Sequence, residues 1–166
     1  MAGRPWLDYP SVQVGLRGAL VSGAVLTAYH LVNNLANLAA RPQALLSACL
    51  LPALGLVYGW AGALATRRSG RLPTGLGAGA VAGFAGSVIG FATLMLITAL
   101  FLNVVRQNTL LLQDFARSGS SSLERFVFED ALGGGAFMLV WGTVLGGACG
   151  VVGGWFARLR ARSSRR

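Results

Sequence analysis

One apolar stretch of the sequence carries a cluster of polar side chains that could do chemistry. His30, Asn33, Asn34 and Asn37 are spaced to share one face of a helix. An imidazole in this setting could relay protons, contact a polar solute or act as the axial ligand of a haem or pigment. The alternative is structural, with these groups forming hydrogen bonds across helices near the membrane interface. We favour the structural interpretation, because one histidine without an intramembrane carboxylate is a poor proton path.

The rest of the sequence offers no catalytic or metal-binding motif. It contains no HExxH, no P-loop and no Ser/His/Asp set, and Cys49 and Cys149 are too isolated to suggest a metal site. No acid or arginine lies deep within an apolar stretch, which disfavours ion-coupled transport but leaves an uncoupled pore open. We therefore predict a protein that is not an enzyme and has neither metal nor cofactor, with haem or pigment at His30 as the exception to test.

Four long stretches without charge must position the polar cluster. They lie between residues 17 and 41, 41 and 67, 71 and 106, and 130 and 158, and contain 23, 25, 34 and 27 residues. A helix needs about 20 residues to cross a bilayer, so each stretch fits one pass. The sequence thus predicts one all-α domain over 1–166, an integral membrane bundle of four helices. The expected segments are an interfacial lead-in at 1–13, helices at about 14–38, 44–66, 74–105 and 123–157, and a basic tail at 158–166.

The connections carry further expectations. Arg41-Pro42 predicts a tight turn, and Pro52 predicts a kink within the second helix. Ser121 and Glu124 match a capping box, which indicates a helix start beyond the serine run. The third and fourth helices would then protrude as a hairpin. Its apolar side chains would pack together or lie on the headgroup surface; they are Leu110, Leu111, Phe115, Phe126 and Phe128.

All of the positive charges are arginines, and their distribution predicts the topology. With the N-terminus inside, ten arginines fall inside and four outside, which satisfies the positive-inside rule. Both termini are then cytoplasmic in a cell membrane, and the arginine usage indicates a GC-rich, prokaryotic source. The tail could bind nucleic acid or anionic lipid, but we expect a plain membrane anchor and no nucleic acid. The expected lipid-anchoring residues are Arg67, Arg68, Arg71, Arg158, Arg160 and Arg162.

Small residues recur every four positions in all four predicted helices. Such a stripe lets another helix backbone approach closely, as in a glycine zipper within a bilayer. The stripes hold the bundle of one chain together or form an interface with another chain, and we favour the first. The packing residues are Gly15 and Gly23; Gly55 and Gly59; Gly75, Gly79 and Gly83; and Gly142, Gly146, Gly150 and Gly154.

A weak internal repeat is also visible. The segment that begins at Val14 resembles the one that begins at Thr74, and the segment from Gly59 resembles the one from Gly154. The first two helices would then correspond to the last two, as a parallel 2+2 repeat about an axis along the membrane normal.

Three functional hypotheses follow from these patterns. Because close-packing stripes dominate, the first is a non-enzymatic membrane protein that acts through helix packing, as an accessory subunit of a membrane complex or as a homo-oligomer. The second is a small channel or facilitator, whose outer vestibule is lined by the polar cluster from His30 to Asn37. The third is a cofactor-binding protein that uses His30 as a ligand. Lipid is the expected partner in each case, with other membrane subunits or a second copy of the chain in the first.

Overall fold

Four long helices make up most of the molecule. The computed structural model describes residues 9–36, 38 and 40–163, and every regular element among them is helical. By length and composition, four of these helices can cross a membrane. They are α1 (Pro10–Leu35), α2 (Ala40–Ser69), α3 (Leu72–Leu100) and α6 (Leu123–Ser163), while α4 (Leu102–Val105) and α5 (Thr109–Ser118) join α3 to α6. The predicted all-α class and the four candidate spans are confirmed at this level.

The observed helix ends differ from several predicted ones. Helix α1 begins at Pro10, since proline suits a first turn, so only residues 1–9 of the predicted lead-in precede it. Residues 1–8 lie outside the described residues. Helix α2 begins at Ala40, and the predicted turn at Arg41-Pro42 is wrong, because a first helical turn needs no backbone donor at Pro42. Helix α6 continues to Ser163, so most of the predicted tail is helical.

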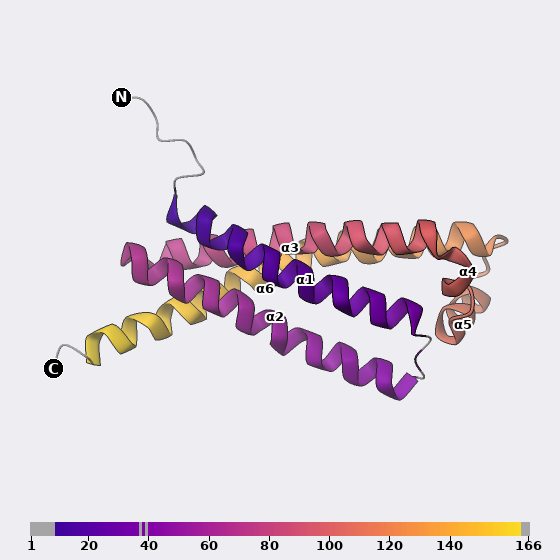
Figure 1. Ribbon diagram of the computed structural model, residues 1–166, viewed down its shortest axis with the longest axis horizontal. Coiled ribbons are helices and arrows are strands. Elements are labelled where there is room, and N and C mark those ends of the chain that lie inside the picture. Colours follow the sequence, from indigo (N-terminus) through magenta and orange to yellow (C-terminus); the bar gives the residue numbers. More distant parts are fainter. Residues whose placement is uncertain (1–8, 37, 39, 164–166) are drawn as a thin grey trace, which may run out of the picture.

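The long helices alternate in direction, and α3 and α6 run side by side (Figure 1). Helix α1 packs against α3, and the second half of α2 packs against α6. The first half of α2 diverges from the α3/α6 pair and stays beside α1, where the hydroxyls of Tyr29 and Ser47 are 3.0 Å apart. The start of α1 and the end of α6 lie at the same end of the bundle. Pro52 lies inside α2 without interrupting it.

Small side chains fill most of the bundle core. Ala61 and Ala65 of α2 and Ala78 and Ala82 of α3 have no exposed surface. Tyr58 is the largest fully buried side chain among the described residues. Many leucines, phenylalanines and tryptophans are instead exposed on the outside, as expected where the surroundings are lipid rather than water.

A compact lobe replaces the predicted hairpin at the far end of the bundle. Helix α3 ends at Leu100, not near residue 105, and α4 and α5 fold back over the start of α6. Ile97, Val105 and Val127 form a buried cluster there, and the Phe115 and Phe126 rings pack with centroids 5.6 Å apart. The apolar side chains of this loop thus pack in part against one another.

Polar contacts fix the ends of the lobe. Arg106 forms an ion pair with Glu124, and Arg125 forms one with Glu129. The backbone N–H of Arg125 donates to Ser122 Oγ at 3.4 Å, and α6 begins at Leu123. Ser122 therefore precedes the first turn, and the predicted cap at Ser121 is displaced by one residue.

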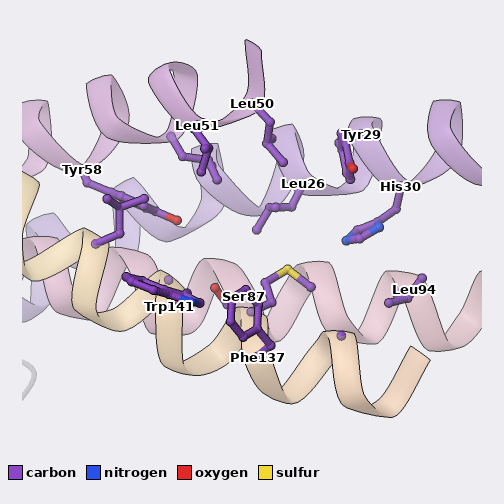
Figure 2. Close-up of a pocket in the computed structure, with 15 residues that line it drawn as sticks. Leu26, Tyr29, His30, Leu50, Leu51, Tyr58, Ser87, Leu94, Phe137 and Trp141 are labelled. Carbon is purple, nitrogen blue, oxygen red and sulfur yellow. The ribbon is translucent and has the colours of Figure 1, made fainter. Parts of the chain in front are cut away.

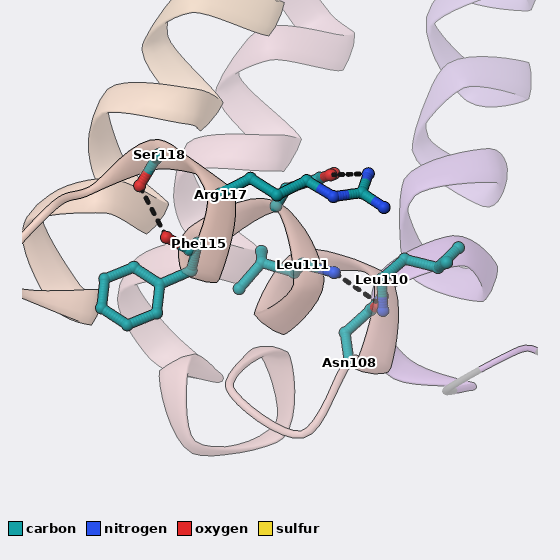
Figure 3. Close-up of polar contacts among 7 residues, drawn as sticks. Asn108, Leu110, Leu111, Phe115, Arg117 and Ser118 are labelled. Atoms are coloured by element: carbon teal, nitrogen blue, oxygen red, sulfur yellow. Dashed lines mark hydrogen bonds and ion pairs between the residues drawn. The ribbon is translucent and has the colours of Figure 1, made fainter.

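The start of α5 depends on one buried asparagine. Asn108 Oδ1 accepts hydrogen bonds from the backbone N–H groups of Leu110 at 3.0 Å and Leu111 at 3.3 Å (Figure 3). We expect Asn108→Ala to destabilise the lobe by about 1 kcal/mol, the usual contribution of an N-cap. Hydrogen exchange should rise at residues 109–112. Asn103→Ala is the matched control at an exposed position, and equal exchange in the two variants would contradict the capping role.

Candidate functional site

Glycines bring α3 and α6 into backbone contact. A β-carbon on Gly150 would lie 2.5 Å from the Gly75 carbonyl oxygen and 3.0 Å from Gly79 Cα. A β-carbon on Gly146 would overlap the Gly79 carbonyl oxygen, and one on Gly83 would overlap the Gly142 carbonyl oxygen. Real β-carbons essentially never come within 3.0 Å of such atoms. These positions of α3 and α6 therefore require glycine, and the contact is within one chain.

The other glycines of the predicted stripes also face neighbouring helices. Gly15 and Gly23 of α1 meet Val81 and Ile89 of α3, and Gly154 of α6 meets Thr66 of α2. A β-carbon at Gly55 or Gly59 would make only ordinary contacts with Cys149, at 3.7 and 3.6 Å.

The closest approach of α2 to α6 uses glycines that the four-residue pattern left out. A β-carbon on Gly62 would overlap the backbone of Gly150, and one on Gly153 would overlap the backbone of Gly59. The pattern follows one face of each helix, whereas these two glycines lie at the crossing point of α2 and α6.

Hydroxyl groups also link α1 to α3. Ser22 Oγ donates to the Ala82 carbonyl oxygen at 3.2 Å, and the hydroxyls of Thr27 and Thr93 are 3.0 Å apart. These are interhelical hydrogen bonds of the kind that the structural interpretation expects, one and two turns before His30.

The described members of the predicted polar cluster differ in burial and in contacts. His30 is buried, while Asn33 and Asn34 are partly exposed, and Asn37 lies outside the described residues. Asn34 Nδ2 donates to the His30 carbonyl oxygen at 2.9 Å, which is a contact within its own helix. Of the described members, only His30 lines a cavity inside the bundle.

That cavity lies between all four long helices and has a volume of about 330 Å³ (Figure 2). Helix α1 contributes Leu26, Tyr29 and His30, and Ser87 and Leu94 come from α3. The remaining lining residues come from α2 (Leu50, Leu51, Leu54 and Tyr58) and α6 (Gly134, Phe137, Met138, Trp141, Gly142 and Leu145). The walls are mainly apolar, and none of the lining residues is an acid or an arginine.

Three polar atoms in this lining are buried without a hydrogen-bond partner. They are His30 Nε2, Tyr58 Oη and Ser87 Oγ, on side chains with exposures of 7%, 0% and 1%. Figure 2 shows the His30 ring and the Tyr58 hydroxyl directed into the space between the helices. Ser22 is the polar neighbour of Tyr58; its hydroxyl donates to the Ala82 carbonyl oxygen and forms no hydrogen bond with Tyr58 Oη. Buried polar groups normally have partners, so these three atoms are free to form hydrogen bonds with a molecule in the cavity.

The cavity opens sideways, toward the surroundings of the bundle. Leu51 is 61% exposed, Phe137 64% and Trp141 52%, and all three line it. Leu51 belongs to the first half of α2, and Phe137 and Trp141 belong to α6, so the opening lies between these two helices. A molecule could thus enter from the lipid phase without crossing the bundle.

Tyr58 and Ser87 were not predicted as site residues. Ser87 continues the small-residue stripe of Gly75, Gly79 and Gly83, and the sequence gives no reason to separate it from that stripe. Tyr58 is a single hydroxyl-bearing side chain in an apolar run, and a buried tyrosine usually needs a partner for its hydroxyl. The need of the Tyr58 hydroxyl for a partner was therefore the feature of the sequence that could have indicated Tyr58 as a site residue.

The predicted anchoring arginines gather at the end of the bundle opposite the lobe. Arg67, Arg68 and Arg71 flank the α2–α3 turn, and Arg158, Arg160 and Arg162 lie on the last turns of α6. The six residues are exposed. Each described acid (Asp114, Glu124, Glu129 and Asp130) lies in or beside the lobe instead, and no three histidine, cysteine or acidic side chains among the described residues could share a metal ion.

Comparison of the chain with protein-family models, with curated proteins and with solved structures finds no match.

Proposed function

We propose that this protein is a non-enzymatic multi-pass protein of the cell membrane that binds one lipophilic molecule in the His30/Tyr58/Ser87 cavity. The observation that carries the proposal is the set of three unpartnered polar atoms around an apolar cavity. Ligand sites commonly combine apolar walls with a few placed polar groups, and their volumes start at about 300 Å³.

The lining specifies the class of ligand. Apolar walls without a charged group favour a neutral molecule, because no lining residue would balance an ionic one. The hydroxyls of Tyr58 and Ser87 can each donate a hydrogen bond, and His30 Nε2 can donate or accept one according to its tautomer. A compact lipophilic body with two or three carbonyl or hydroxyl oxygens satisfies these groups. A haem or pigment bound through His30 Nε2 would instead give the purified protein a visible absorption band.

The glycine stripes take a structural role in this proposal. They form a glycine zipper within one chain and hold α3 against both α1 and α6, so that the cavity has one rigid side. The divergent half of α2 forms the other side. The predicted 2+2 repeat stays a prediction.

The hypotheses of an accessory subunit or homo-oligomer, and of a channel, stay predictions. The glycine stripe of α6 lies against α3 and α2 and so offers no free face for a partner; association would use other surfaces. A channel would need the polar cluster to line a common space, and only His30 of its described members does so. A solute flux into vesicles that changes with His30→Ala would support the channel.

Trp141 offers a direct reporter of cavity binding. In a variant whose other tryptophans (Trp6, Trp60 and Trp155) are replaced by phenylalanine, menadione, a compact lipophilic diketone, is expected to quench Trp141 saturably. Replacing Tyr58 by phenylalanine and Ser87 by alanine removes two hydrogen bonds of about 1 kcal/mol each, which predicts about 30-fold weaker binding. Thr143→Ala is the control, because it removes a hydroxyl that bonds within its own helix and lies outside the lining. Unsaturable quenching, equal in all variants, would contradict the proposal.

A further inference from the structure

A second hollow lies on the outer face of α2 and α6, away from the cavity. It is a groove of about 530 Å³, and its floor is formed by small residues of both helices. Gly55, Gly59 and Ala63 come from α2, and Cys149 and Gly153 come from α6. Leu56, Trp60, Val152 and Phe156 also line the groove and give it bulky apolar walls.

The groove leads to arginines at one end. Arg67 continues the α2 series of 55, 59 and 63, and Arg160 lies one helical turn beyond Phe156. A neighbouring hollow of about 390 Å³ shares Arg67 and Ala157 with the groove and adds Arg158 and Arg162. Four arginines therefore line the two hollows at this end, where the last turns of α6 diverge from the end of α2 (Figure 1).

The charges of this end are not balanced by the described part of the chain. The described acids lie in α5 and at the start of α6, while Arg158, Arg160 and Arg162 lie at the end of α6. The three ion pairs of the described residues all involve arginines of the lobe region. An apolar groove that ends in several arginines is complementary to an acyl chain that ends in an anionic headgroup.

We infer that the α2/α6 groove is a binding site for one anionic phospholipid. Its phosphate contacts Arg67 and Arg160, and one acyl chain lies along the small-residue floor. The groove accounts for a small residue at Gly55, where a β-carbon would meet α6 only at an ordinary distance, 3.7 Å from Cys149 Sγ. This inference is independent of the ligand proposed for the His30/Tyr58/Ser87 cavity.

The test compares the binding of an anionic and a zwitterionic lipid to the intact protein. The purified chain is titrated in mild detergent with dioleoyl phosphatidylglycerol or dioleoyl phosphatidylcholine, and bound lipid is counted by native mass spectrometry. Phosphatidylglycerol is expected to bind first, with one copy per chain. Arg67→Gln with Arg160→Gln should weaken that first binding by about 30-fold.

A matched variant distinguishes lipid binding at a defined site from general attraction of anionic lipid to the arginines of this end. Arg68→Gln with Arg71→Gln removes the same charge from the same end, but neither residue lines the groove or the neighbouring hollow. This variant is expected to bind the first lipid within about twofold of the original chain. Equal losses in both double variants, or equal binding of the zwitterionic lipid, would overturn the inference. Displacement by millimolar glycerol 3-phosphate would show a phosphate site without a lipid groove, and would also overturn it.

Discussion

Replacing Gly146 by alanine is expected to destabilise the protein by about 2–3 kcal/mol, as overpacking of a tight core does. The added β-carbon would overlap the carbonyl oxygen of Gly79 and lie 3.1 Å from Gly83 Cα. Backbone atoms cannot turn aside as a flexible side chain can, so α3 and α6 must move apart. Thermal unfolding in mild detergent, followed by size-exclusion chromatography, measures the loss.

The adjacent glycine supplies the control for this substitution. A β-carbon on Gly147 would lie 3.8 Å from Ala80 Cβ and 3.9 Å from Leu76 Cγ, which are ordinary contacts. Gly147→Ala is therefore expected to leave stability unchanged or to raise it by up to about 1 kcal/mol through helix propensity. Equal stability of the two variants would contradict the α3/α6 contact. If Gly146→Ala lost an oligomer while the chain itself stayed stable, the glycine stripe of α6 would belong to an interface between chains.

Filling the cavity is expected to abolish binding of its lipophilic ligand while leaving the fold intact. Gly134 lines the cavity, and a β-carbon there would meet no atom within 4 Å. A phenylalanine at this position can occupy the cavity without displacing backbone. In the variant that retains Trp141 as its single tryptophan, Gly134→Phe should weaken saturable quenching by menadione by 100-fold or more, on the order of 3 kcal/mol.

Gly133 provides a matched position for the same change. It is the neighbouring residue of α6 and also meets no atom within 4 Å, but it does not line the cavity. Gly133→Phe is expected to bind menadione as the parent does, and both variants should unfold at similar temperatures. If Gly134→Phe binds as well as Gly133→Phe, the ligand lies elsewhere.

The sequence predicted the helices better than their ends or the site. Long charge-free stretches have few alternatives in a bilayer, so all four candidate spans were found. The end of α3 was missed because Leu100, Phe101 and Leu102 continue the apolar pattern, and only tertiary packing in the lobe turns the chain there. Prolines marked helix starts at Pro10 and Pro42 rather than turns.

The site could be predicted only in part, because it depends on helix geometry. His30 was found since a histidine is rare in an apolar span. Tyr58 and Ser87 lie on different helices, and their meeting depends on how α2 crosses the α3/α6 pair. Neither spacing nor composition encodes that crossing. Asn33 and Asn34 share the helical face of His30, yet they lie beyond the cavity toward the end of α1.

The central claim, that the cavity holds a lipophilic molecule, is tested most directly by native mass spectrometry of the protein released gently from its own membrane. One bound molecule, of the same mass in each preparation, is expected on each chain of the unmodified protein and of Gly133→Phe. None is expected on Gly134→Phe. Chains without a bound molecule in the unmodified protein, or the same bound mass on all three proteins, would contradict it.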